Sequence, residues 1–371
     1  MFSITCEQMA LYENVQVVSR GVSGRSTQPI QNNILLEAKD EQLILIATDL
    51  EYISIKTTMA VSAADEGQIT MPSRIFTDVA GSLAPGPVTL TANESNSVAI
   101  HGGHSDFNIR GLPADDFQEL PELADAVRFA MPAEKLLDVL ERTVFATSTD
   151  ETRPILTGAL FKISGTNLAT VATDTYRLAL YETQLESDVE RDVEAIVSRR
   201  ALNELERVVS ASSAEEVEIG ISSNQIEFVV GDTVIGSRLI EGQFVNYPKV
   251  IPTGTDKRIT VNSEELRSTL ERALVVARQD ANRVVLRAKD DILTVSAQSQ
   301  DVGKVEETLD VTMEGEDAEI AFNAIYLMHM LDAAECDKVT IEVSGPLNSG
   351  LLHPADDEGY VYVLMPMQIM A

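Results

Sequence analysis

The stretch FSITCEQMALYENVQVVS, residues 2–19, decides the fold because it returns twice further along the chain. Its counterparts are FAMPAEKLLDVLERTVFAT at residues 129–147 and ITVNSEELRSTLERALVVA at residues 259–277, and the three starts lie 127 and 130 residues apart. Each begins with a short apolar strand pattern and continues with apolar residues at helical spacing. Recurrence at such a long, nearly constant interval indicates a repeated structural unit.

Two further landmarks keep the same interval. ITMPSRIFTDVAGSL, AIVSRRALNELERVV and IAFNAIYLMHMLDAA form one series, and LILIATDLEYISI, LATVATDTYRLAL and ILTVSAQSQDVGK form the other. The chain is therefore predicted to hold three copies of one domain. The boundaries fall where Pro, Gly and charged residues cluster, which places the copies at residues 1–122, 126–252 and 256–371.

Each copy has the pattern of a strand, a helix and several further strands. Leu136, Leu140 and Val144 mark one apolar helix face, and the cap-like residues Ser198, Ser263 and Asn323 mark helix starts. Alternating runs such as VTLTANESNSVAIHG are bounded by Asn, Ser and Gly, as in antiparallel strands. The predicted class is α+β, with much antiparallel sheet.

The composition is that of a folded, cytoplasmic protein. Of 371 residues, 44% are hydrophobic and 23% are charged, which is enough apolar material for several cores. Cys6 and Cys336 are too few for a disulfide framework and lack metal-ligand spacing. No N-terminal leader pattern and no long apolar run is visible, so a cytoplasmic location is expected.

No catalytic constellation stands out, and we predict no catalytic residue, no metal and no cofactor. GDTVIGSR (residues 231–238) has phosphate-loop glycine spacing but lies between strand patterns, so it is interpreted as a hairpin. His101–His104 is interpreted as a hairpin tip, and His329 as a helix-surface residue. Asp49 and Asp174 recur in step with the repeat, which favours turn architecture. A nuclease that uses these two aspartates is the enzymatic alternative.

The net charge of −31 argues at first against nucleic acid, because DNA-binding proteins usually present a basic face. The helix-like segments, however, hold about 11 of the 28 Lys and Arg residues against about 13 of the 59 Asp and Glu residues. Lys135 and Arg142 are seven apart, as are Arg200 and Arg207, so each pair shares a helix face. Either these faces are ordinary solvated surfaces, or they face a polyanion while the sheets carry the acidic charge.

Specific motifs close the three copies: LPADDFQELP at Leu112, LIEGQFVNYPKVIP at Leu239 and YVYVLMPMQ ending the third. Together with ATDLE, VATDTYRLA, ETRPILTG and VEETLDVT, they make the whole chain resemble the bacterial DNA polymerase III beta subunit family of sliding clamps. The resemblance implies a head-to-tail homodimer that closes into a ring, with helices inside and sheets outside, around double-stranded DNA. It implies a processivity factor in DNA replication and not an enzyme.

The resemblance also implies site residues. A partner-peptide pocket between copies two and three would comprise Leu156, Thr173, Tyr176, Arg177, Leu178, Val245, Val250, Val363, Leu364, Met365, Pro366 and Met367. DNA-facing cations would be Arg25, Arg74, Arg199, Arg200, Arg207 and Lys249, to which helix-face spacing adds Lys135 and Arg142. The dimer interface would include Phe107, Ile109, Val275, Val276, Glu306 and Glu307.

The implied partners are the DNA polymerase III alpha subunit, the clamp-loader complex and other proteins that carry QLxLF-like motifs. The chain departs from the family's usual pattern at Asp150, Tyr176, Val245 and Gln368, which bears on DNA contact and on peptide preference. A peptide-binding scaffold that forms no ring is the alternative to a clamp, and the native mass of the protein distinguishes the two.

Overall fold

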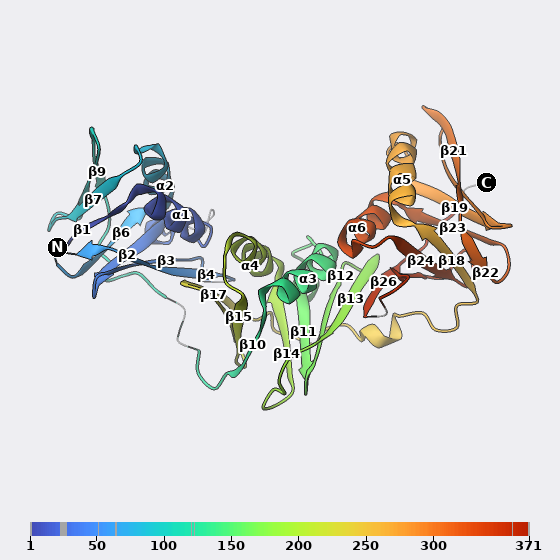
Figure 1. Cartoon of the computed structure of the whole chain (residues 1–371), viewed down its shortest axis with the longest axis horizontal. Coiled ribbons are helices and arrows are strands. Elements are labelled where there is room, and N and C mark those ends of the chain that lie inside the picture. The colour runs from blue at the N-terminus through green and yellow to red at the C-terminus, as the bar shows by residue number, and fades with distance from the viewer. Residues whose placement is uncertain are drawn as a thin grey trace. The chain divides into compact units, whose positions relative to one another are not determined.

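The computed structural model describes residues 2–22, 28–50, 52–63, 65–119, 121, 123–357 and 359–369 (Figure 1). The chain divides into two compact units, one of residues 1–137 with 200–240 and the other of residues 138–199 with 241–371. We call them the first and the second unit and describe each by itself. The α-helices of the described residues are α1 (Gln8–Ser19), α2 (Ser73–Ser82), α3 (Ala133–Thr143), α4 (Arg199–Ala211), α5 (Ser263–Ala277) and α6 (Ala324–Ala334).

Two sheets build the first unit. The five-stranded sheet has the order β5-β1-β7-β8-β9, with β1 (Phe2–Glu7), β5 (Ser62–Ala63), β7 (Pro87–Ala92), β8 (Ser97–Gly102) and β9 (Ser105–Arg110). The eight-stranded sheet has the order β10-β15-β16-β17-β4-β3-β2-β6, with β2 (Asn33–Lys39), β3 (Gln42–Thr48), β4 (Ser54–Ala60), β6 (Gly67–Pro72), β10 (Val127–Pro132), β15 (Glu216–Ile221), β16 (Gln225–Val230) and β17 (Thr233–Arg238). Strand β17 pairs antiparallel with β4, with Ile235 opposite Ile55.

Two sheets also build the second unit. The nine-stranded sheet has the order β14-β11-β12-β13-β26-β25-β24-β18-β22, with β11 (Gly158–Ser164), β12 (Asn167–Thr173), β13 (Arg177–Gln184), β14 (Val193–Ser198), β18 (Lys257–Asn262), β22 (Thr312–Glu314), β24 (Lys338–Val343), β25 (Gly350–Pro354) and β26 (Tyr360–Leu364). The four-stranded sheet has the order β21-β20-β19-β23, with β19 (Arg283–Lys289), β20 (Ile292–Ser299), β21 (Gly303–Asp310) and β23 (Ala318–Asn323). Strand β13 pairs antiparallel with β26, with Leu178 opposite Val363.

The predicted α+β class and the antiparallel pairing are confirmed, but the compact units differ from the repeats. The second copy is divided, because β10 and β15–β17 join the sheet of the first copy while β11–β14 join the sheet of the third. Backbone hydrogen bonds and cross-strand side-chain contacts continue through both junctions. Adjacent copies therefore share sheets.

The helices bury one apolar face each. Leu11, Val15 and Val18 of α1 are fully buried, at the spacing of four and three residues that one helix face requires. In α5, Leu266 and Leu270 repeat that pattern, and α5 packs against β20 and β21. Each such side chain contributes roughly 1.5–3 kcal/mol by leaving water.

The helix caps correct one prediction. Asn323 caps α6 as predicted, since its side chain accepts a hydrogen bond from the Ile325 amide. Helix α5, however, is capped by Asn262 and not by Ser263. The Asn262 side chain accepts from the Glu265 amide at 3.0 Å, and Ser263 is already the first helical residue. An asparagine in extended conformation places its oxygen within reach of the third amide.

The two predicted hairpins are confirmed. His101–His104 includes the turn between β8 and β9, where Gly103 adopts a positive φ of 59°. The His101 ring is exposed and contacts Asp106 at 2.7 Å. Residues 231–238 form the turn after β16 together with β17. Among the described residues, no helix is both long and apolar enough to cross a membrane.

Candidate functional site

The turn that links β12 to β13 presents a tyrosine to solvent. The Asp174 Oδ1 atom accepts hydrogen bonds from the amides of Tyr176 and Arg177 at 2.9 and 3.0 Å. The Thr173 hydroxyl donates to the Arg177 carbonyl at 2.6 Å, and Thr175 takes a positive φ of 81°. Thr and Asp side chains stabilise such turns because they are short and can bond nearby backbone groups. The result is that Tyr176 projects outward, with 63% of its surface exposed.

The first unit repeats this turn. The Asp49 Oδ1 atom accepts from the amides of Tyr52 and Ile53 at 2.8 and 2.9 Å, and its Oδ2 atom pairs with Arg200. The Asp174 Oδ2 atom likewise accepts a hydrogen bond from Arg177 Nε, at 3.0 Å. The predicted turn role of both aspartates is confirmed. All four carboxylate oxygens of the two residues thus accept hydrogen bonds or form ion pairs within the fold.

The C-terminal segment lies against the Tyr176 turn. After β26, the Met365 amide donates to the Tyr176 carbonyl at 2.9 Å, and the Met367 amide donates to the Ala321 carbonyl at 2.7 Å. These bonds fix a residue on either side of Pro366. The Met365 side chain is 44% exposed, and its sulfur accepts from the Ser349 hydroxyl at 3.2 Å. We call Tyr176, Ser349 and Met365 the Tyr176–Met365 surface.

The residues predicted for the partner pocket all lie in the second unit, but at two depths. Tyr176, Val245, Val250 and Met365 are exposed, and Pro366 and Met367 are partly exposed. Val245 and Val250 flank the short 3-10 helix η4 (Tyr247–Lys249), whose last turn bonds the Val250 amide to the Tyr247 carbonyl at 2.9 Å. Leu156, Thr173, Arg177, Leu178, Val363 and Leu364 are buried. These six lie in the core of the unit, whereas the other six reach its surface.

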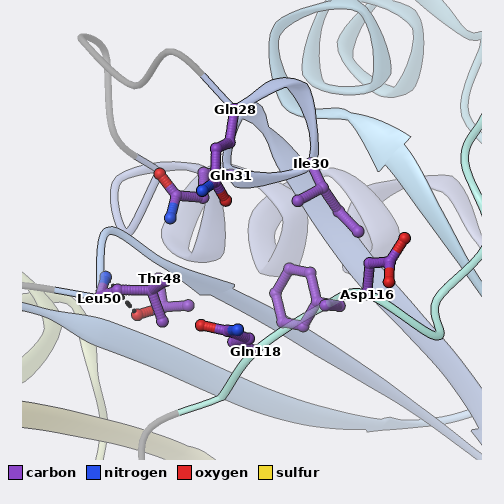
Figure 2. A pocket seen from close by; sticks show the side chains of 8 residues that line it. Gln28, Ile30, Gln31, Thr48, Leu50, Asp116 and Gln118 are labelled. Atoms are coloured by element: carbon purple, nitrogen blue, oxygen red, sulfur yellow. Dashed lines mark hydrogen bonds between the residues drawn. The ribbon is translucent and has the colours of Figure 1, made fainter.

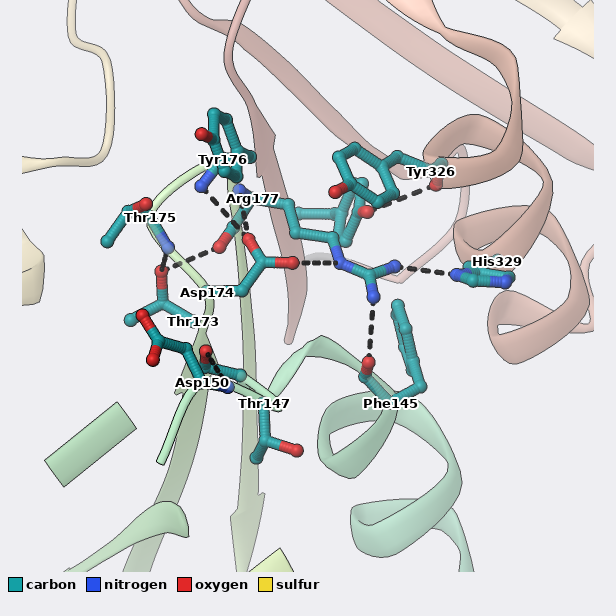
Figure 3. A network of polar contacts seen from close by, with 12 residues as sticks. Phe145, Thr147, Asp150, Thr173, Asp174, Thr175, Tyr176, Arg177, Tyr326 and His329 are labelled. Atoms are coloured by element: carbon teal, nitrogen blue, oxygen red, sulfur yellow. Dashed lines mark hydrogen bonds and ion pairs between the residues drawn. The ribbon is translucent and has the colours of Figure 1, made fainter. Parts of the chain in front are cut away.

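Arg177 is the centre of a polar network under this surface (Figure 3). Its Nε atom donates to Asp174, its Nη2 atom donates to the Phe145 carbonyl at 2.9 Å, and its Nη1 atom meets His329 Nδ1 at 2.7 Å. The guanidinium lies 4.4 Å from the ring centre of Tyr326 and 5.2 Å from that of Phe145. A buried cation is tolerated only when it is paired and hydrogen-bonded, and this one has both kinds of partner.

The network corrects the prediction for His329, which is half-buried against Arg177 instead of lying free on a helix surface. Burial, helped by the adjacent guanidinium, lowers the pKa of His329 below its usual value of 6.5. Tyr326, three residues earlier on the same helix face, was missed by the sequence analysis, as was Phe145. The spacing of Tyr326 and His329 on a mainly apolar helix was the available signal.

The predicted DNA-facing cations differ in availability. Arg74 and Lys249 are exposed, whereas Lys135 and Arg199 are partly exposed. Arg207 has 59% of its side chain exposed and pairs with Glu204 at 2.7 Å. Arg200 is held by Asp49 and by the carbonyls of Arg20 and Val22. Arg25 lies outside the described residues.

Arg142 has to be removed from the DNA-facing set. Its guanidinium pairs with Asp357, and it lies 4.7 Å from the ring centre of Tyr181, with only 18% of the side chain exposed. The spacing of seven residues predicted that Lys135 and Arg142 share an exposed helix face. The Arg142 side chain instead packs against residues of the same chain, Asp357 and Tyr181. It joins the second copy to the third.

In the described residues, each unit has a strand at a sheet edge that pairs on one side only and that the prediction places at the dimer interface. Strand β9 is an edge of the five-stranded sheet, and β21, which carries Glu306 and Glu307, is an edge of the four-stranded sheet. Val275 of α5 is 69% exposed, and Val276 is partly exposed. Strand edges of this kind are open to pairing with another chain.

Three other residues predicted for the dimer interface are less available. Ile109 is only 8% exposed and belongs to the core of its own sheet, whereas Phe107 is partly exposed. Glu307 is bound by Arg272 at 2.6 Å, which lowers the pKa of its carboxyl group. Ile109 is therefore a packing residue. The Glu307 carboxylate stays ionised, and Arg272 of the same chain balances its charge.

A hollow in the first unit lies beside the turn that follows β3 (Figure 2). It is lined by Gln28, Ile30, Gln31, Thr48, Leu50, Asp116, Phe117 and Gln118. The lining is largely polar, in contrast to the exposed Tyr176, Val245, Val250 and Met365. Within the described ranges, no cluster of three or more His, Cys, Asp or Glu residues could hold a metal ion. Burial also raises the pKa of the Cys6 thiol to about 11, which makes it a poor nucleophile.

The chain is similar to known proteins along all three copies of the repeat. Residues 2–121, 130–248 and 248–368 match the N-terminal, central and C-terminal domains of the DNA polymerase III beta subunit. The chain is 32% identical over 365 residues to a beta sliding clamp of Vibrio cholerae, covering 98% of this chain and 99% of that one. It is 33% identical to a beta sliding clamp of Staphylococcus aureus, covering 94% of each. A solved DNA polymerase sliding clamp from Bacillus subtilis superposes with a TM-score of 0.94, at 29% identity and full coverage of both chains. The chain therefore belongs to the DNA polymerase III beta subunit family, the bacterial beta sliding clamps.

Proposed function

We propose that two copies of the chain close into a ring around duplex DNA, and that the ring holds the replicative polymerase on its template. The observation that carries the proposal is the Tyr176–Met365 surface, where two large apolar side chains stay exposed although hydrogen bonds fix the backbone beneath them. A docking surface needs such rigid, exposed apolar groups. The ring itself is a non-catalytic processivity factor that acts in the bacterial cytoplasm.

Ring closure is supported by the two open strand edges. Strand β9 of one protomer would pair with β21 of its partner, and the exposed Val275 would be covered in the same contact. Head-to-tail pairing uses both edges in each protomer, so two copies leave neither edge open. A monomeric native mass would instead favour the scaffold that forms no ring.

The DNA contact is supported by cations that remain exposed, in particular Arg74, Arg207 and Lys249. Few such contacts are needed, because a closed ring is retained by topology. Phosphate contacts are blind to sequence, which suits a ring that slides. The excess of acidic residues elsewhere repels DNA from the remaining surface.

Neutralising Arg74 and Arg207 together, as Arg74→Ala with Arg207→Ala, is expected to weaken binding to primed duplex DNA. Each lost phosphate contact lowers the salt dependence, so the slope of log affinity against log salt falls by about 2. Titration of the dimer with labelled DNA at several salt concentrations measures this slope. The matched control is Arg128→Ala, an arginine on a sheet with 55% of its side chain exposed. Equal slopes in the double variant and the control would exclude these cations from the DNA contact.

The peptide proposal concerns a short segment of the polymerase alpha subunit, with related segments in the clamp loader and other partners. A Leu and a Phe of the QLxLF type would cover Tyr176, Val245, Val250 and Met365. Each buried side chain contributes roughly 1.5–3 kcal/mol, from which the ordering of the peptide subtracts, leaving an affinity on the order of micromolar. Met365 suits varied partners because its side chain is flexible.

Tyr176→Ala with Met365→Ala is expected to weaken a QLxLF-type peptide about 100-fold, because both exposed apolar contacts are lost. Calorimetry measures the affinity, and sedimentation checks that the dimer is unchanged. The control is Ile292→Ala, which removes an apolar side chain of equal exposure, 44%, elsewhere in the second unit. An unaltered affinity in the double variant would place the peptide on another surface.

A further inference from the structure

The contact between Arg177 and His329 joins the third copy to the turn that carries Tyr176. We propose that His329 is a positioning residue: in its neutral form it holds the Arg177 guanidinium, and through it the Tyr176 turn, in the arrangement that receives the peptide. This inference rests on the proposed function. It adds a pH-dependent control of the same surface.

The geometry determines which tautomer of His329 is present. Arg177 Nη1 and His329 Nδ1 are 2.7 Å apart, and an arginine can only donate. Nδ1 must therefore be the acceptor, and the proton of the neutral ring lies on Nε2. Protonation of the ring puts a hydrogen on Nδ1, facing the guanidinium, and adds a second positive charge. The hydrogen bond then becomes a repulsive contact.

The surroundings keep the ring neutral near pH 7. Burial and Arg177 lower the pKa of His329, and Arg199 lowers it further, whereas Asp332 and Asp174 oppose them. The charged groups that act on the ring are Arg177 and Asp174 from the turn, Asp332 from its own helix and Arg199 from the start of α4. The Phe145 ring packs edge-on against it. Because the pKa in the folded protein lies below 6.5, the unfolded chain binds the proton more readily. The contribution of neutral His329 to the stability of the folded protein is thus complete above pH 6.5. It is lost as the pH falls below that value.

The link from the guanidinium to the surface is short. Arg177 donates to one oxygen of Asp174, and the other oxygen of Asp174 holds the amides of Tyr176 and Arg177. The Tyr176 carbonyl in turn accepts from the Met365 amide. Displacing the guanidinium therefore disturbs the carboxylate that organises the turn, and with it both apolar side chains of the Tyr176–Met365 surface.

Two variants separate the hydrogen bond from the titration. His329→Asn places an oxygen where Nδ1 stands and does not titrate, whereas His329→Leu removes the acceptor. The matched control is His353→Asn, a partly buried histidine of the second unit that bonds Pro354 and Glu342 instead. The probe is acetyl-Gln-Leu-Ser-Leu-Phe-amide, which carries no group that titrates between pH 5 and 8.

Calorimetry between pH 5 and pH 8 is expected to show constant affinity for the unmodified protein above pH 6.5. In acid the affinity falls about tenfold, the effect of losing one hydrogen bond to a charged group. His329→Asn should bind with the same affinity across the whole range. His329→Leu should bind about tenfold more weakly at every pH, and His353→Asn should follow the unmodified protein. Identical profiles for His329→Asn and the unmodified protein would overturn the proposal.

A second measurement works without peptide. In protein with ¹⁵N-labelled arginine, the Arg177 Nε–H resonance should shift along the titration curve of His329 and stay constant in His329→Asn. If the unmodified protein binds no peptide at any pH while this resonance follows His329, the proposed peptide function fails and the positioning of Arg177 stands. An Arg177 resonance that ignores both pH and the variant rejects the inference even where the peptide binds.

Discussion

Val275→Glu is expected to convert the dimer into monomers. Val275 is 69% exposed in the single chain, so the substitution leaves the protomer folded. In the ring it would lie beside the β9–β21 contact, where a carboxylate loses its water without gaining a partner. The lost apolar contact and the desolvated charge together amount to about 3 kcal/mol, or a rise in the dimer Kd of about 100-fold.

Sedimentation equilibrium at low micromolar concentration measures this change, and retention on nicked circular DNA measures its consequence. Leu347→Glu is the control, since Leu347 is as exposed, at 74%, and lies outside both strand edges. Ile109 is unsuitable for this test because it is buried in its own sheet, so replacing it would unfold the protomer. A Val275→Glu protein that remains dimeric would refute the proposed interface.

Arg177→Met is expected to destabilise the second unit by about 3–5 kcal/mol, the usual effect of removing one partner of a buried ion pair. Arg177 and Asp174 have only 7% and 14% of their side chains exposed. The substitution leaves the Asp174 Oδ2 atom and the Phe145 carbonyl without the donors that the guanidinium supplies. It also removes the cation that lies between the rings of Phe145 and Tyr326.

Urea unfolding followed by circular dichroism measures the loss of stability. Arg267→Met is the control: Arg267 makes ion pairs with Glu271 and Asp332, but 42% of its side chain is exposed. Exposed pairs contribute about 0–1 kcal/mol, so this variant should unfold close to the unmodified protein. If the two variants lost similar stability, the Arg177 network would contribute no more to the free energy of unfolding than an exposed ion pair.

The sequence determined the repeat, the class and the turns. Nearly equal intervals between 2–19, 129–147 and 259–277 indicate three copies, and the helical and alternating periods within each copy follow from which face meets the core. Asp49 and Asp174 were predictable as turn residues because their Oδ1 atoms bond backbone amides no more than four positions along the chain. Local hydrogen bonds leave local patterns.

Only the tertiary structure decided which side chains are available. Arg142 has helix-face spacing typical of an exposed cation, yet Asp357, more than two hundred residues away, takes its charge. Ile109 and Leu178 match interface and pocket positions, yet both side chains are buried within their own unit. The Arg177–His329 contact joins residues 152 positions apart through the pairing of β13 with β26 and the packing of α6. Such contacts depend on how separate copies pack against one another, and the periodicity within one copy carries no information about that packing.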